Sequence, residues 1–117
     1  MGSILEHQNL IKKTELLGQK EIPGIRFFDR IVGKFYTRKG RRIAINRKGM
    51  ADQWAIYPLN GVLAHFEIEY KTGKARQTKE QKAWQKFIEK QGGVYFLVRD
   101  EFEAVKQIKE YIKEKRL

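Results

Sequence analysis

Two glutamates and a lysine alternate with apolar residues in the stretch HFEIEYK, residues 65–71. Successive side chains of a β-strand point to opposite faces, so Glu67, Glu69 and Lys71 would share one face. Carboxylates that flank a hard cation such as Mg²⁺, with a lysine beside them, suit metal-assisted phosphodiester hydrolysis, because the metal neutralises phosphate charge and acidifies a bound water. The lysine can orient that water or stabilise developing negative charge. The alternative is an ordinary solvated strand face.

A neighbouring strand must supply a second acidic group beside Glu69, and Asp52 is the candidate. It follows the sequence KGMA at the start of the strand expected to pair with residues 62–70 across a hairpin. Asp also commonly caps turns that follow a glycine. Because Glu69 and Lys71 lie in register with Asp52, we favour the ligand over the cap.

Three other polar side chains near this set are open to two interpretations. Glu67 is either a further acidic group near the metal or a surface residue. Gln81 stands three residues after Thr78, the spacing of a capping box that satisfies backbone N–H groups at a helix start. His65, like His7, lacks ligand spacing, so we expect His65 to lie at the surface or to contact substrate.

The composition favours a polyanionic partner. Lys and Arg number 25 against 14 Asp and Glu, a net charge of +11 on 117 residues, whereas a thermophile-style surface would balance the two signs. Hydrophobic residues make up 41% of the chain, enough for the core of one domain. The absence of cysteine excludes disulfides and thiolate metal ligands. With no membrane-spanning run and no secretory pattern, we expect an intracellular, cytoplasmic protein without membrane contact.

Two basic segments flank the candidate acidic residues. The first is a predicted hairpin that leads directly to Asp52, and the second follows Lys71 and runs into a helix start, which also suits phosphate. Such side chains contact the nucleic-acid backbone rather than base edges, so we expect shape and not sequence to be selected. The DNA-binding candidates are Arg38, Lys39, Arg41, Arg42, Arg47 and Lys48 in the first segment and Lys74, Arg76 and Lys79 in the second.

The elements that must position these residues can be read from periodicity and turn signals. A helix is expected at residues 4–17, ending at Gly18. Strands follow at 25–28, 34–36, 41–45 and 51–57, the last ending at Pro58, and then at 62–70. In that last strand the even positions are apolar and should face the core.

The C-terminal half predicts two helices around one strand. Residues 78–91 carry the capping box and an apolar stripe that includes Trp84 and Phe87, and Gly92-Gly93 ends the helix. Residues 94–98 form a fully apolar strand of the kind buried on both faces. Asp100 starts a last helix whose inner stripe is Phe102, Val105, Ile108 and Ile112. The fold class is therefore α/β, a mixed sheet flanked by helices in the order α-β-β-β-β-β-α-β-α.

These motifs together resemble the PD-(D/E)xK nuclease signature and, more narrowly, the VRR-NUC family of virus-type replication-repair nucleases. The family pattern Gly-x-Pro-Asp corresponds to residues 49–52, Ile-Glu-Val-Lys-Thr-Gly to residues 68–73, and Ser-x-x-Gln to residues 78–81. Ala51 replaces the proline and Tyr70 replaces an aliphatic residue. The match also takes in GGVYFLVRD and an acidic residue on the first helix, so it covers nearly the whole chain.

The resemblance implies a single nuclease domain over residues 1–117, with a restriction-endonuclease-like core and Mg²⁺- or Mn²⁺-dependent cleavage of DNA. It implies that Asp52 and Glu69 bind the metal, with the backbone carbonyl of Tyr70 as a further ligand and Glu6 as an additional candidate. Lys71 would assist the attacking water, and Gln81 would face the catalytic pocket. For small phage-type members it further implies a homodimer that acts on branched DNA such as four-way junctions, in a phage or its prokaryotic host.

The first hypothesis is therefore a metal-dependent, structure-selective DNA endonuclease with Holliday-junction-like resolvase activity. One alternative is a basic module that binds DNA or RNA without cutting it, although carboxylates inside a binding groove would repel phosphate. Another is a sequence-specific restriction or homing nuclease of the same fold. The number of metal ions, one or two, stays open with the roles of Glu6 and Glu67.

Overall fold

The computed structural model describes residues 4–30, 33–36, 42–45 and 49–117 of the chain. The described residues form helices and strands in the order α1 (Ile4–Glu21), β1 (Arg26–Asp29), β2 (Gly33–Tyr36), β3 (Arg42–Ile45), β4 (Gln53–Leu59), β5 (Val62–Tyr70), α2 (Lys79–Lys90), β6 (Val94–Val98) and α3 (Glu101–Lys115). No helix among them is long and apolar enough to span a bilayer.

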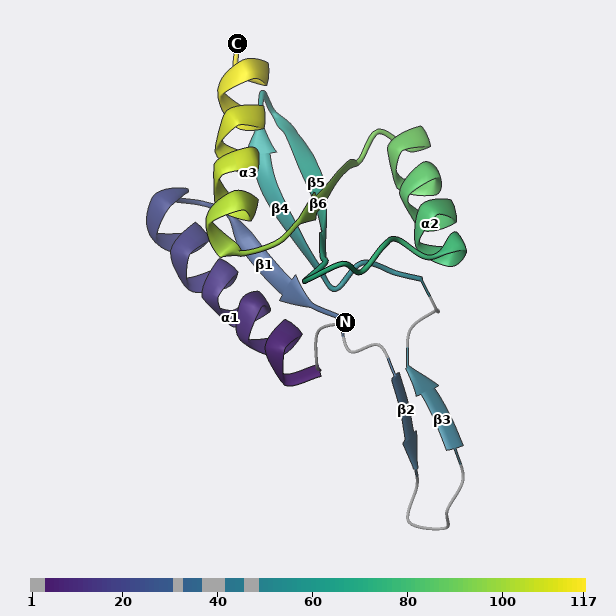
Figure 1. Cartoon of the computed structure of the whole chain (residues 1–117). Helices are drawn as coiled ribbons and strands as arrows, with labels where there is room; N and C mark the ends of the chain where they lie inside the picture. The colour runs from purple at the N-terminus through teal and green to yellow at the C-terminus, as the bar shows by residue number, and fades with distance from the viewer. Residues whose placement is uncertain (1–3, 31–32, 37–41, 46–48) are drawn as a thin grey trace.

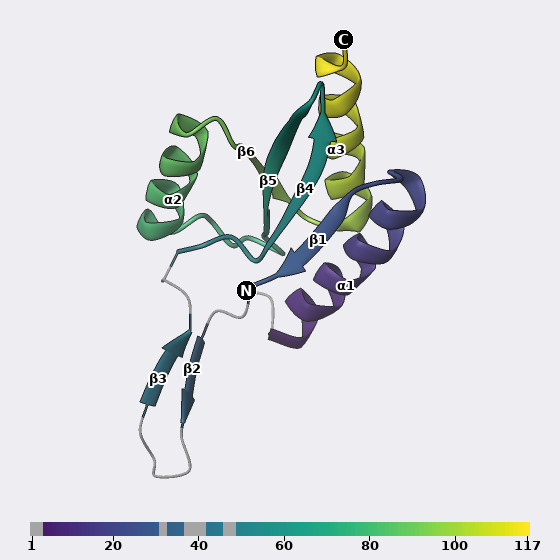
Figure 2. The ribbon, with the colours of Figure 1, turned by 180° about the vertical axis from the view of Figure 1, so that it is seen from behind.

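Four strands form a mixed sheet in the order β1-β4-β5-β6. The pairs β1–β4 and β4–β5 are antiparallel, whereas β5 and β6 run parallel and are connected through α2. The predicted mixed α/β class is therefore confirmed. Strands β2 and β3 form a separate antiparallel ribbon that projects away from the rest of the protein (Figures 1 and 2).

The helices cover the two faces of the sheet unequally. Helices α1 and α3 lie side by side on one face, and α2 lies on the other (Figures 1 and 2). The main core fills the space under α1 and α3, where Phe66, Ile68 and Tyr70 of β5 are fully buried. The predicted apolar even face of this strand is thus confirmed from Phe66 to Tyr70, whereas Val62 at the start of the strand is 70% exposed. The odd face, with Glu67 and Glu69, points toward α2 and is also buried.

A buried polar link ties α1 to the sheet within this core. The Tyr70 hydroxyl lies 2.6 Å from both Thr14 Oγ1 and Gln53 Oε1, and Gln53 Nε2 donates to the backbone carbonyl of Ile11 at 3.1 Å. An amide oxygen can only accept, so Tyr70 donates to Gln53 and accepts from Thr14. Each of these buried groups is satisfied, and the link fixes α1 against the strands that carry Asp52 and Glu69.

The first helix continues beyond Gly18, where the sequence predicted its end. A Cβ atom at Gly18 would lie 2.4 Å from Cζ of Phe27, too close for any side chain. The glycine is therefore a point of close approach between α1 and β1 rather than a stop signal. The predicted strand end at Pro58 is also wrong, because Pro58 lies within β4 opposite Leu63. Strand β1 pairs with β4 only as far as Ile56, so a proline at position 58 interrupts no ladder on that side.

Other apolar residues predicted to be buried are exposed as well. Leu97 is 45% exposed because β6 is an edge strand and not a central one. Phe102 and Phe87 are 67% and 52% exposed, although they fall on the predicted inner stripes of α3 and α2. The other predicted residues of the α3 stripe, Val105, Ile108 and Ile112, are buried as expected, and Ala104 joins them.

Candidate active site

Strand pairing places Asp52 next to the Glu69 end of β5. The pairing of β4 with β5 begins with Gln53 opposite Ile68, so Asp52 occupies the position facing Glu69. Its Oδ2 accepts a hydrogen bond from the backbone N–H of Tyr70 at 2.8 Å, and its carbonyl accepts one from the N–H of Arg30 at 3.1 Å. The side chain is 25% exposed, so a ligand can reach it.

Glu69 is almost fully buried but keeps one carboxylate oxygen without a hydrogen bond. Its Oε1 accepts from the Tyr95 hydroxyl and from Gln77 Nε2 at 3.2 Å. Burial, followed by the hydrogen bond to Glu69, raises the pKa of Tyr95, so the hydroxyl stays protonated and donates. Oε2 has no hydrogen-bond partner in the described part of the chain and forms an ion pair with Lys71 Nζ at 3.3 Å. Lys71 therefore supplies the one charged contact of this buried oxygen among the described residues.

Lys71 joins Glu69 to the start of α2. Its Nζ donates to Gln81 Oε1 at 2.7 Å, and the same oxygen accepts from the backbone N–H of Thr78 at 2.8 Å. Gln81 N–H in turn donates to Thr78 Oγ1, which completes the predicted capping box. The cap and the contact with Lys71 are therefore both present, and the Gln81 amide oxygen takes part in both.

A glycine brings the loop before Asp52 against the same helix. Gly49 has φ +93°, and a Cβ there would lie 2.7 Å from backbone and side-chain atoms of Glu80. Only glycine combines this conformation with so close an approach. The glycine of the family pattern thus has a physical role, because it packs the Asp52 loop onto the first turn of α2.

The charges around Asp52 leave it poorly compensated. Burial raises the pKa of Asp52 above its ordinary value, and the nearby Glu69 charge adds to the rise. The hydrogen bond from Tyr70 and the positive charges of His7 and Lys71 oppose it without cancelling it. A cation between Asp52 and Glu69 would relieve both the desolvation and the like-charge repulsion.

Helix α1 turns His7 toward Asp52. Its Nδ1 lies 3.8 Å from Asp52 Oδ1, and its Nε2 is buried with no hydrogen-bond partner among the described residues. No sequence pattern singles out His7, because it has no ligand spacing and its orientation depends on how α1 packs. Glu6, the residue of this helix expected to contribute, has an exposed side chain, and its role stays a prediction.

The donors at this site suit magnesium. Within residues 4–30, 33–36, 42–45 and 49–117, no group of three or more His, Cys, Asp or Glu side chains is arranged to hold a metal ion. Mg²⁺ does not need such a cage, because it is usually bound by one or two carboxylates, several waters and substrate phosphates. Asp52 and Glu69, whose Oε2 lacks a hydrogen bond, are the two carboxylates that could fill this role. Tyr70 stands between Glu69 and Lys71 in the sequence, and its carbonyl remains a predicted third ligand.

Glu67 is fully engaged in a structural network. Its side chain is completely buried, Arg30 binds it with two guanidinium nitrogens, and His65 Nε2 and Trp84 Nε1 also donate to it. Burial alone would raise the pKa of Glu67, but these hydrogen bonds outweigh it and hold the pKa below its ordinary value. The surface interpretation of Glu67 is therefore wrong, and the hydrogen bonds that occupy its oxygens argue against a metal ligand.

A basic cavity of about 360 Å³ adjoins Lys71. Arg76, one of the predicted DNA-binding residues, lines it, while Lys74 and Lys79 are exposed nearby. Lys82 and Arg99 also line the cavity and were not predicted. Arg99 could have been anticipated, because β5 and β6 are parallel and their carboxyl ends meet at one edge of the sheet.

The basic hairpin expected before Asp52 cannot be placed against the site. Its predicted residues Arg38, Lys39, Arg41, Arg47 and Lys48 lie outside the described residues, and of Arg42 only the backbone is described, at the start of β3. Their contacts with DNA stay predictions.

Comparison with known proteins identifies no family for this chain. No protein-family model matches the chain. A search of curated proteins finds no match either. The likeness to VRR-NUC nucleases therefore depends on the motif residues themselves, and the site has to be judged by its chemistry.

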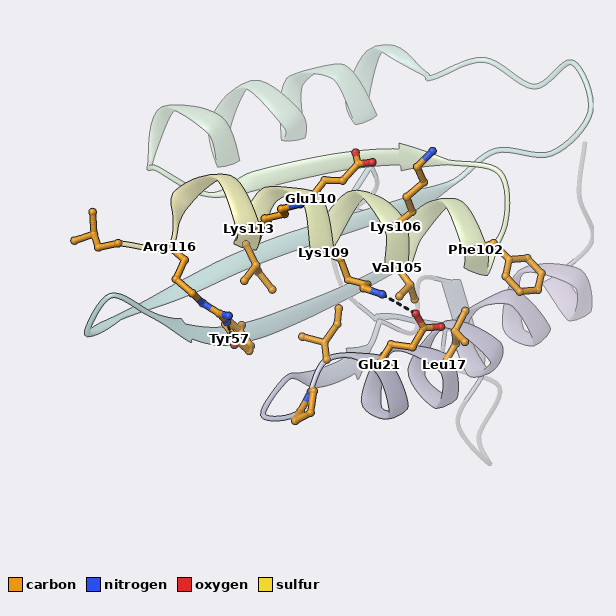
Figure 3. Close-up of a pocket in the computed structure, with 14 residues that line it drawn as sticks. Leu17, Glu21, Tyr57, Phe102, Val105, Lys106, Lys109, Glu110, Lys113 and Arg116 are labelled. Atoms are coloured by element: carbon orange, nitrogen blue, oxygen red, sulfur yellow. Dashed lines mark hydrogen bonds and ion pairs between the residues drawn. The ribbon is translucent and has the colours of Figure 1, made fainter.

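A cavity larger than the one beside Lys71 lies in another part of the protein. It measures about 840 Å³ and lies between α1 and α3, where Leu17, Val105 and Tyr57 line it and Lys109 forms an ion pair with Glu21 (Figure 3). None of the candidate catalytic residues contributes to it. The carboxylate chemistry has to be sought at the Asp52–Glu69 end of the sheet.

Proposed function

We propose that the protein is a divalent-metal-dependent DNA endonuclease that cleaves branched DNA. The observation that supports this most strongly is the meeting of Asp52, Glu69 and Lys71 at one end of β4 and β5, with a buried Glu69 oxygen that lacks a hydrogen bond. A buried carboxylate oxygen that has an ion pair with Lys71 but no hydrogen bond is incompletely satisfied, and a bound cation would add a second charge to offset its burial.

The metal, when bound by Asp52 and Glu69, supplies charge neutralisation at the phosphate and acidification of a water. The side chains around it do the positioning. The Tyr70 N–H holds Asp52, while Tyr95 and Gln77 hold Glu69, so both carboxylates are oriented before substrate arrives. The Lys71 ammonium, held by Gln81 at 2.7 Å, lies where it can orient the attacking water or stabilise negative charge on the phosphate.

Positive charge beside the site supports a nucleic-acid substrate. The cavity next to Lys71 is lined by Arg76, Lys82 and Arg99, and the whole chain carries a net charge of +11. These groups suit the phosphates that flank a scissile bond. A preference for branched DNA and action as a homodimer are added from the resemblance to the small VRR-NUC nucleases.

The test is cleavage of a labelled four-way junction and of a linear duplex of the same sequence, with Mg²⁺ and with EDTA. Wild type should cut the junction only with the metal, and Glu69→Gln should lose turnover while binding the junction at least as tightly. Glu114→Gln, which makes the same change at an exposed position of α3, should behave as wild type. Absence of metal-dependent cleavage in wild type, or full activity in Glu69→Gln, would refute the proposal, and equal cutting of the duplex would refute its branched-DNA part.

A further inference from the structure

Three aromatic rings form a continuous stack across three neighbouring strands. Phe28 on β1 stacks on Trp54 of β4, with ring centroids 4.3 Å apart and an angle of 21° between the planes. Trp54 stacks on His65 of β5 at 5.3 Å and 24°. We call Phe28, Trp54 and His65 the aromatic stack.

The aromatic stack lies on the face of the sheet that carries the candidate active site. Trp54 pairs with Glu67 across β4 and β5, and residues two apart on one strand share a face, so Trp54 lies on the same face as Asp52 and Glu69. Two residues along a strand correspond to about 6.6 Å. Arg30, two residues after Phe28, donates its N–H to the carbonyl of Asp52. One segment of nucleic acid could therefore contact both the stack and the metal site.

A buried network holds the inner part of the stack in place. Glu67 accepts a hydrogen bond from His65, and it fixes Arg30, whose guanidinium carbon lies 6.0 Å from the Trp54 ring centroid and 5.5 Å from that of Trp84. A rigid aromatic surface loses little conformational entropy when a ligand stacks on it.

The outer end of the stack is accessible. Trp54 covers one side of the Phe28 ring, and Phe28 is 39% exposed. Strand β1 is an edge strand of the four-stranded sheet, so no strand of the described chain pairs with it on its outer side. A nucleobase is a flat ring that can continue such a stack, and stacking of unpaired bases on aromatic side chains is a general mode of single-strand recognition. The net charge of +11 attracts the phosphates that accompany the base.

We infer that Phe28 stacks on an unpaired nucleobase, so that the substrate carries single-stranded nucleotides next to the phosphate that is cut at the proposed Asp52–Glu69 metal site. This inference rests on the proposed function for the position of the cut, but the stacking itself can be tested without catalysis. A junction or flap offers such nucleotides near its branch, whereas an intact duplex keeps its bases paired.

The experiment compares two single-stranded decamers of equal charge in EDTA, one of thymidines and one of abasic sugar-phosphates. Wild type should prefer the thymidine decamer by about fivefold or more, the least effect expected from one stacked base. Phe28→Leu should abolish that preference, while Phe28→Tyr should retain it. Phe102→Leu, the same change at an exposed position of α3, should leave it unchanged. Thermal unfolding of each variant confirms that it is folded.

Equal binding of both decamers by wild type, or an unchanged preference in folded Phe28→Leu, would overturn the inference. Neither result depends on cleavage. If wild type prefers thymidines through Phe28 but cuts no DNA with Mg²⁺, the stacking site stands and the nuclease proposal fails. If it cuts junctions but shows no preference for bases, the nuclease stands and the stacking site fails.

Discussion

The Lys71 ammonium lies 3.3 Å from Glu69 Oε2 and 2.7 Å from Gln81 Oε1, so one cation connects the buried carboxylate of β5 to the first turn of α2. In the proposed mechanism, this position lets Lys71 orient the attacking water or stabilise negative charge on the phosphate. It also explains how Glu69 remains buried without a complete set of hydrogen bonds, because an ion pair offsets part of the desolvation cost.

Replacing this lysine should therefore remove catalysis and leave DNA binding largely intact. We expect Lys71→Ala to reduce the single-turnover rate of junction cleavage about 100-fold or more, as for loss of a group that stabilises charge in the transition state. Electrophoretic mobility shift in EDTA should show binding within a few-fold of wild type. Lys106→Ala on α3 removes the same charge elsewhere and should keep the wild-type rate, and cleavage by Lys71→Ala at that rate would exclude the assigned role.

The poorly compensated charge of Asp52 should make the metal-free protein less stable than a variant that lacks this charge. An acid whose pKa is raised by folding binds its proton more tightly in the folded state, so stability falls as the pH rises from 3.8 through the folded pKa and stays reduced at neutral pH. Asn is neutral and can still accept from the Tyr70 N–H. In metal-free buffer at pH 7, calorimetry should give Asp52→Asn a melting temperature above that of wild type.

Metal should reverse this order. MgCl₂ should raise the melting temperature of wild type, because a ligand that binds only the folded state stabilises it, and should leave Asp52→Asn unchanged. Asp29→Asn, at an exposed position of β1, should keep the full response to magnesium. A magnesium response equal to that of wild type in Asp52→Asn would contradict Asp52 as a ligand.

Glu67 should matter for folding rather than for catalysis. Glu67→Gln breaks a buried ion pair and leaves Arg30 without its carboxylate, a change that typically costs about 3–5 kcal/mol. Urea unfolding at pH 7 should report this loss. The exposed change Glu114→Gln should cost less than about 0.5 kcal/mol.

The same carboxylate gives wild type an acid sensitivity. Folding lowers the pKa of Glu67. The contribution of its charged form to the free energy of unfolding is therefore complete above pH 4.5, the ordinary pKa, and is lost as the pH falls through the pKa of the folded state. Wild type should lose stability steeply below that pH, and Glu67→Gln should show a shallower profile. Parallel profiles for the two proteins would argue against this assignment.

Gly18 offers a test of the packing between α1 and β1. A methyl group there would lie 2.4 Å from the Phe27 ring, so Gly18→Ala should destabilise the fold by about 1–3 kcal/mol despite the better helix propensity of alanine. Gln19→Ala, at the next position of the helix, which is exposed, should leave the free energy of unfolding unchanged. Urea unfolding distinguishes the two, and a stabilised Gly18→Ala would mean that the helix does not approach the strand this closely.

The sequence predicted the parts of the site that depend on local periodicity. Strand alternation places Glu69 and Lys71 on one face and Tyr70 on the other, and the tight turn between β4 and β5 sets Asp52 opposite Glu69. The capping box at Thr78 and Gln81 likewise follows from a spacing of three residues. These relationships involve neighbours in the chain or in one hairpin.

The parts that were missed depend on how separate elements pack. His7 reaches Asp52 only through the orientation of α1, and Glu67 meets Arg30 only because β1 pairs with β4. The sequence predicts a helix end at Gly18, because a glycine is a common stop signal and its contact with Phe27 forms only in the tertiary structure. The exposure of Leu97 follows from the place of β6 at the sheet edge, which the composition of the strand does not reveal.

The most direct test of the central claim is anomalous diffraction from crystals of the protein soaked in MnCl₂. The account predicts a manganese peak between the carboxylates of Asp52 and Glu69, within about 2.2 Å of an oxygen of each, as for hard divalent ions in oxygen sites. The same soak of Glu69→Gln should lose the peak. Manganese bound elsewhere in wild type, with no peak between these two side chains at a concentration that supports cleavage, would contradict it.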